Sequence, residues 1–221
     1  MAGKKRKIRF VRDIYVNREY SWLHFNRRVL NQAKDAANPL LERCKFLSIF
    51  TSNLDEFFMI RVGSLVTQLT HAPSLKENKT ELTAAEQIEG ILHEMGDLYK
   101  KKHTVFSLLK AELYKNGISL TKGTDLSGRQ KKECEEYFRL RVLPLLSPMV
   151  LDAKHPMIRF ENLQTYMVVQ LSRGDRTMFG IMGVSPKIER LYVIKGGKKV
   201  HLIAIEDIVS QFIHLAFPGY D

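Results

Sequence analysis

The chain has few cysteines and no long apolar run, and each absence excludes a class of protein. Cys44 and Cys134 are the two cysteines among 221 residues, and they lack the spacing of a zinc knuckle. A disulfide scaffold is therefore excluded, and a reducing compartment, the cytoplasm, is expected. No apolar run reaches the length of about 18 residues that a membrane span needs, and no apolar segment follows the basic N-terminus. We therefore expect no transmembrane segment and no secretory signal, and at most a peripheral association with the inner membrane.

The standard signatures of metal sites and phosphate loops are also missing. The seven histidines are scattered and form neither an HExxH motif nor a Cys/His cluster, so no metal site is expected. The patterns GxxxxGK[ST], GxGxxG after a strand and GxSxG are absent. Gly196-Gly197 precedes two lysines, but strand-like residues flank the pair, which favours a hairpin turn over a phosphate loop.

Positive charge is in excess, and much of it lies at the N-terminus. The formal net charge is +11, and residues 1–17 carry six Lys and Arg side chains against one Asp. Such a run is more typical of a solvated terminus than of a dedicated anion site. We expect residues 1–16 to form a disordered basic tail on a mildly basic body, which a polyanionic partner could suit.

Apolar residues recur at helical spacing through the first half of the chain. Asn17 is predicted to cap a helix that ends near Ala36, and Asn38-Pro39 to cap and start the next. Thr51-Ser52-Asn53 interrupts the following apolar run and predicts a new helix with Asn53 as its N-cap.

A capping box at Thr83 and Glu86 opens a much longer helical pattern, which ends at Asn116-Gly117. At 1.5 Å per residue this helix would be roughly 50 Å long. A second capping box, Ser127 with Gln130, predicts a helix that ends before Pro144.

Strand patterns are expected only after about residue 160. Residues 166–171 and 177–184 predict one antiparallel pair, 190–194 and 199–203 a second, and 204–216 a last helix. The sequence therefore predicts an α+β fold in two parts. A helical domain of antiparallel helices, one of them very long, covers residues 17–117, and an incomplete α+β head domain with antiparallel strands covers 118–221.

The best candidate for functional chemistry is the segment 52–58, SNLDEFF. If Asn53 starts a helix, unpaired N–H groups and the positive helix dipole lie beside its amide, which could read a nucleobase edge or bind phosphate. Asp55 and Glu56 would oppose a bare anion, which favours contact with a neutral base. A purely structural interpretation, with Asn53 as a cap and the two phenylalanines in the core, stays open.

Two long strings in the first third of the chain closely resemble one known family. They are YVNREYSWLHFNRRVL at residues 15–30 and SNLDEFFMIRV at residues 52–62. Both resemble the N-terminal domain of the polyphosphate kinase family, in the large bacterial class whose catalytic domains are phospholipase-D-like. Pro144–Pro148, His155-Pro156 and Asn162-Leu163 resemble that family's head domain more loosely. Tyr20, in place of the usual leucine, and the run 157–160 depart from the pattern.

The resemblance implies a reversible transfer of the ATP γ-phosphoryl group to the end of inorganic polyphosphate, through a phosphohistidine. It implies that the catalytic histidine, the phosphate-binding arginines and the Mg²⁺ ligands lie in C-terminal domains beyond this chain. It also implies that Asn53 contacts the nucleotide and that the head domain contributes to a homo-oligomer. We thus expect a fragment that supplies part of the nucleotide-site wall and an oligomer surface, is inactive alone, and has no nucleic-acid partner. The alternative is a non-catalytic module that binds polyphosphate or nucleic acid.

Overall fold

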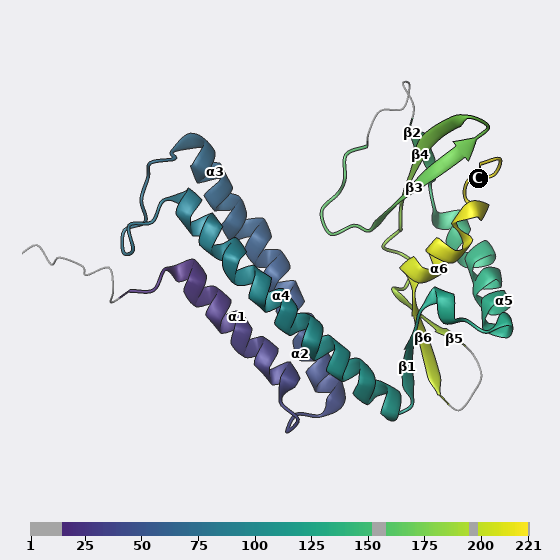
Figure 1. Cartoon of the computed structure of the whole chain (residues 1–221), viewed down its shortest axis with the longest axis horizontal. Helices are drawn as coiled ribbons and strands as arrows, with labels where there is room; N and C mark the ends of the chain where they lie inside the picture. Colours follow the sequence, from purple (N-terminus) through teal and green to yellow (C-terminus); the bar gives the residue numbers. More distant parts are fainter. Residues whose placement is uncertain (1–14, 152–157, 195–198, 221) are drawn as a thin grey trace, which may run out of the picture. The chain divides into compact units, whose positions relative to one another are not determined.

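The structure is a computed structural model that describes residues 15–151, 158–194 and 199–220. The expected basic tail lies almost entirely outside these residues, and the turn at Gly196-Gly197 lies entirely outside them. The chain divides into two compact units, Met1–Glu112 and Leu113–Asp221, one helical and one mixed (Figure 1). The predicted α+β class is confirmed, and the domain limits of 17–117 and 118–221 stay predictions.

The described residues of the helical unit form four α-helices, and Figure 1 shows α4 running alongside the line that α2 and α3 make together. Their bounds are Arg18–Lys34 for α1, Leu40–Glu56 for α2, Gly63–His71 for α3 and Ala84–Lys115 for α4. A π-helical turn, Phe57–Val62, joins α2 to α3. The 32 residues of α4 correspond to about 48 Å, as the long pattern predicts. No helix in the described residues is long and apolar enough to cross a membrane.

Side-chain caps begin two of these helices as predicted. The Asn17 side chain accepts a hydrogen bond from the Glu19 N–H at 2.9 Å and so caps α1. At the start of α4 the Glu86 carboxylate accepts from the Thr83 N–H at 2.7 Å, and Thr83 Oγ1 accepts from the Glu86 N–H at 3.3 Å. Both capping predictions are confirmed.

The start of α2 differs from the prediction. Pro39 occupies the N-cap position without a side-chain cap, so the expectation that Asn38 caps this helix is wrong. The Asn38 amide instead donates to the carbonyl of Gln32 at 3.0 Å. This carbonyl lies in the last turn of α1, where carbonyls have no partner within the helix, so Asn38 serves the end of α1.

The helix α2 also continues through Thr51-Ser52-Asn53, so the prediction that Asn53 caps a new helix is wrong. Thr51 Oγ1 donates to the Leu47 carbonyl at 3.1 Å, so its hydroxyl is satisfied within the helix. A continuous buried face spans the segment, and its burial outweighs the weak helix propensity of the three polar residues. This face consists of Leu47, Phe50, Leu54 and Phe57.

These four residues belong to the core cluster of the helical unit. Leu23, Leu30 and Ala33 of α1 pack into the same cluster with Ile91, Met95 and Leu98 of α4. The buried residues of each helix lie three, four or seven positions apart, so they form a single stripe along that helix. The ion pair of buried Arg43 with Glu112, at 2.5 Å, further ties α2 to the end of α4.

The described residues of the mixed unit form two three-stranded sheets. One has the order β1-β6-β5, with strands Ile118–Thr121, Val200–Ala204 and Leu191–Ile194. The other has the order β2-β4-β3, with strands Met149–Leu151, Arg176–Gly183 and Tyr166–Arg173. Helices α5 (Gly128–Tyr137) and α6 (Ile205–Phe212) contribute Cys134, Ile208 and Phe212 to its core. A π-helical turn, Phe138–Val142, and three short 3₁₀ turns, Gly123–Asp125, Leu143–Leu145 and Ile213–Leu215, complete the described elements.

Both predicted antiparallel pairs are present, with Val168 opposite Ile181 and Val193 opposite Leu202. The capping box of Ser127 and Gln130 is also confirmed. The expectation that strands occur only after residue 160 is wrong, because β1 and β2 precede it. These strands have four and three residues, too few to show a periodicity. Moreover, β1 pairs in parallel with β6, about eighty positions later.

Candidate functional site

Asn53 lies in the last turn of α2 and faces α1. Its Nδ2 donates to Oδ1 of Asn26 at 3.0 Å. Asn26 is fully buried, and its own Nδ2 donates to the Phe50 carbonyl at 3.0 Å. Because both ends of the Asn26 amide have a partner, this residue holds the Asn53 amide in one orientation. Among the described residues no other group bonds the Asn53 side chain, so its Oδ1 and one N–H remain for a ligand.

Asn53 lines a hollow of about 260 Å³ at the junction of α1, α2 and the following π-helical turn. The hollow is lined by Trp22, Phe25, Asn53, Glu56, Phe57, Ile60 and Arg61. The five residues from α2 and the turn recur at i, i+3, i+4, i+7 and i+8, so they share one helix face. A π-helical turn within an α-helix is frequently found at functional sites.

One wall of the hollow is aromatic. The Trp22 ring stacks on the buried Phe57 ring, with centroids 4.3 Å apart and an interplanar angle of 11°. Phe25 meets the Trp22 ring edge to face at 6.5 Å and leaves much of its own ring exposed. A planar, uncharged ring is therefore the kind of group that this wall can accommodate.

Arg61 also lines the hollow, and its guanidinium is held in position. Glu19 is fully buried and accepts from Arg61 Nη1 at 3.2 Å and from Arg18 Nε at 2.6 Å. Because the Glu19 carboxylate holds one edge of the Arg61 guanidinium, the remaining N–H donors of this half-exposed side chain can bind a ligand. Glu56, which is exposed, also lines the hollow and brings a negative charge to it.

Asn53 as a nucleotide-binding residue stays a prediction, but the surroundings that the sequence predicted for it are wrong. No helix begins at Asn53, so the predicted helix dipole and unpaired N–H groups are not beside its amide. Asn26 and Arg61 were not recognised as parts of the site. The sequence did contain a sign of Asn26, because this polar residue falls at helical spacing between Leu23 and Leu30 of the buried stripe of α1. Among the described residues no three His, Cys, Asp or Glu side chains lie close enough to hold one metal ion.

Comparisons with known proteins match almost the whole chain to one family. The family model described as "Polyphosphate kinase N-terminal domain" matches residues 15–121, and that described as "Polyphosphate kinase middle domain" matches residues 129–221. The polyphosphate kinase of Staphylococcus epidermidis is 37% identical over 207 residues, which cover 94% of this chain and 28% of that protein. The polyphosphate kinase of Bacillus cereus is 40% identical over 214 residues, covering 93% and 30%.

A solved structure agrees with these matches. The crystal structure of polyphosphate kinase from Porphyromonas gingivalis superposes with a TM-score of 0.79 at 25% identity, covering 93% of this chain and 31% of that one. The chain therefore spans less than a third of the length of the relatives that it matches.

Proposed function

Because the chain belongs to the polyphosphate kinase family, we propose that its helical unit forms one wall of the nucleotide site of such an enzyme. The proposed reaction is the reversible transfer of the ATP γ-phosphoryl group to the end of inorganic polyphosphate, through a phosphohistidine. The observation that carries the proposal is the Asn53 amide, oriented by buried Asn26 beside an aromatic wall.

The geometry of this hollow fits an adenine base. The unused N–H and Oδ1 of Asn53 form a donor and acceptor pair, which matches the acceptor and donor that adenine presents side by side. The exposed part of Phe25, braced by the Trp22–Phe57 stack, offers an aromatic surface for the base. Arg61 could donate to the ribose or to a phosphate, whereas Glu56 disfavours a phosphate directly at Asn53.

The remaining chemistry is assigned to residues beyond those described. Mg²⁺ would accompany ATP in the proposed reaction, but the described residues do not fit it, since no suitable group of three ligands is present among them. We assign neither the phosphohistidine nor a metal ligand to this chain. The head domain is proposed to contribute to a homo-oligomer, and the free thiols Cys44 and Cys134 support a cytoplasmic location.

A chimaera tests the proposal. Residues 1–221 replace the matching N-terminal part of the Bacillus cereus polyphosphate kinase, and polyphosphate synthesis is measured against ATP concentration. Asn53→Asp replaces Nδ2 by oxygen, which removes both the free N–H and the donor to Asn26 Oδ1, and it adds negative charge near Asp55 and Glu56. One lost hydrogen bond corresponds to a roughly two- to tenfold increase in the KM for ATP, with kcat little changed.

The control is Ser52→Asp, which adds the same charge at an exposed neighbouring position outside the hollow. A thermal melt of each variant shows whether it folds. An unchanged KM in a folded Asn53→Asp variant would remove Asn53 from the nucleotide site. If the chimaera makes no polyphosphate while the 221-residue chain binds polyphosphate directly, the non-catalytic binding module is the better function.

A further inference from the structure

A buried carboxylate holds two arginine side chains at the start of α1. The Glu19 side chain is completely buried, and its two oxygens accept hydrogen bonds from different guanidinium groups. Oε1 accepts from Arg18 Nε at 2.6 Å, and Oε2 accepts from Arg61 Nη1 at 3.2 Å. Arg18 belongs to α1, whereas Arg61 belongs to the π-helical turn between α2 and α3. One carboxylate therefore brings together two guanidinium groups from distant segments of the chain.

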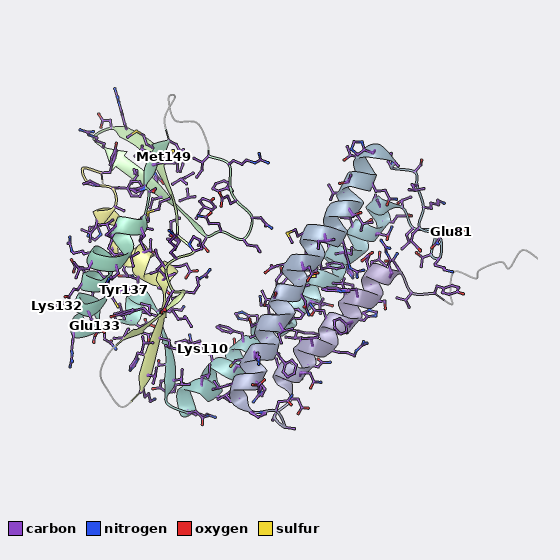
Figure 2. The ribbon with its side chains drawn as sticks, turned by 180° about the vertical axis from the view of Figure 1, so that it is seen from behind. Glu81, Lys110, Lys132, Glu133, Tyr137 and Met149 are labelled. Atoms are coloured by element: carbon purple, nitrogen blue, oxygen red, sulfur yellow. The ribbon has the colours of Figure 1, made fainter. Side chains whose placement is uncertain are left out.

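The first turn of α1 is itself fixed by a second buried side chain, that of Asn17. Its Nδ2 donates to Gln87 Oε1 at 3.0 Å and to Thr80 Oγ1 at 3.4 Å, and its Oδ1 accepts from the Glu19 N–H at 2.9 Å. Gln87 belongs to α4, and Thr80 belongs to the preceding loop, which carries Glu81 in Figure 2. Because Asn17 and both of these partners are buried, Glu19 and the arginines bonded to it have a defined place in the helical unit.

The two arginines carry more positive charge than Glu19 needs. A buried carboxylate is costly unless it is paired, but one guanidinium is enough to balance its charge. The second leaves a surplus of positive charge at the surface, where the Arg18 and Arg61 side chains are 75% and 41% exposed. Among the described residues each arginine bonds only Glu19, so several N–H groups of both remain without a partner. Two such guanidinium groups suit the oxygens of a phosphate.

Arg61 connects this pair to the hollow that Asn53 lines. It lines the same hollow, as does the exposed Glu56. Glu56 lies three residues after Asn53 in α2, and its carboxylate repels a phosphate at the Asn53 amide. A ligand with its base in the hollow and a phosphate on the two arginines therefore matches the charges of both places.

We propose that Arg18 and Arg61 together bind one phosphate group, and that Glu19 is the residue that positions their guanidinium groups. The identity of the ligand rests on the proposed function, since we expect the phosphate to belong to the nucleotide whose base occupies the hollow. The end of a polyphosphate chain presents the same chemistry, and the experiments below distinguish the two sources. Each arginine donates charge-assisted hydrogen bonds to the phosphate oxygens, while its bond to Glu19 fixes its direction.

The chimaera with the Bacillus cereus enzyme tests the phosphate site. Arg18→Met and Arg61→Met should each raise the KM for ATP roughly tenfold or more, with kcat little changed, because each removes a charge-assisted hydrogen bond. Inorganic tripolyphosphate, which has neither base nor ribose, should inhibit the use of ATP, and its inhibition constant should rise in parallel. The control is Lys45→Met, which removes one positive charge from an exposed lysine of α2 outside the hollow and should change neither constant.

Two variants that conserve charge test the positioning role of Glu19. Glu19→Asp keeps the negative charge but shortens the side chain by one methylene, so it no longer reaches both guanidinium groups at once. Arg61→Lys keeps the positive charge but replaces the planar fork by a single ammonium. Both should raise the KM for ATP and the inhibition constant of tripolyphosphate several-fold. A thermal melt shows whether each variant folds, and the half-exposed Arg61 decides the point if Glu19→Asp does not fold. Wild-type constants in the folded variants would overturn the positioning role.

The reverse reaction, with ADP and polyphosphate as substrates, separates the two sources of phosphate. If the arginines bind the nucleotide, their variants raise the KM for ATP and leave the KM for polyphosphate unchanged. A KM that rises for polyphosphate but not for ATP would overturn the nucleotide as the ligand. Wild-type constants in folded Arg18→Met and Arg61→Met, or a raised KM for ATP with unchanged inhibition by tripolyphosphate, would overturn the phosphate site itself. An unchanged KM in Asn53→Asp beside raised values in both arginine variants removes the base contact alone and leaves the phosphate site supported.

Discussion

Replacing Asn26 by Ala tests whether this buried amide positions Asn53. The change removes two hydrogen bonds of 3.0 Å, one donated to the Phe50 carbonyl and one accepted from the Asn53 amide. Each contributes about 0.5–1.5 kcal/mol net. The Asn53 side chain is only half-buried and can turn to water, so no polar group of Asn53 is left stranded. We therefore expect the free energy of unfolding to fall by about 2 kcal/mol.

Urea unfolding of the 221-residue chain measures the fall in the free energy of unfolding. The chimaera with the Bacillus cereus enzyme measures the effect of Asn26→Ala on the KM for ATP. Since Asn26 touches no ligand in the proposed site, kcat should stay near that of the wild type while the KM for ATP rises several-fold. The control is Asn31→Ala, which changes an exposed asparagine on the same helix and should alter neither quantity. A destabilised Asn26→Ala variant with an unchanged KM would refute the positioning role.

Two further predictions concern stability alone. Arg43→Met removes a buried guanidinium that donates to the Ala33 carbonyl at 3.1 Å and pairs with α4, and a thermal melt should show a loss of about 2 kcal/mol. At Glu77, desolvation opposes ionisation, but hydrogen bonds from the Thr80 N–H and hydroxyl outweigh it and lower the pKa of this carboxyl. A lowered pKa in the folded state adds stability above the unfolded-state pKa, and this stability is lost as the pH falls through the folded-state value. Urea unfolding between about pH 6 and 3 should therefore show a smaller acid loss for Glu77→Gln than for the wild type, and equal losses would contradict this account.

Local patterns in the sequence determined where several elements begin. Asn17, the Thr83–Glu86 box and the Ser127–Gln130 box each cap the helix that they predict. A cap joins a side chain to a backbone group two or three residues away, so a short stretch of sequence contains everything that it needs. The hairpin β3–β4 was predictable for the same reason, because its two strands are joined by a short turn. Two local strings also identified the family, and the family matches confirm it.

The surroundings of Asn53 depended on contacts between distant parts of the chain. The polar run of Thr51, Ser52 and Asn53 predicts a helix start on local propensity, but buried Phe50 and Leu54 on either side keep the helix continuous. The Asn26–Asn53 bond joins residues 27 positions apart, and β1 finds its parallel partner about eighty positions later. A residue's local pattern does not specify such partners, because packing selects them from many segments of similar propensity. The sequence could therefore propose Asn53 as a candidate, whereas the orientation of its amide and the aromatic wall beside it arise only when α1 packs against α2.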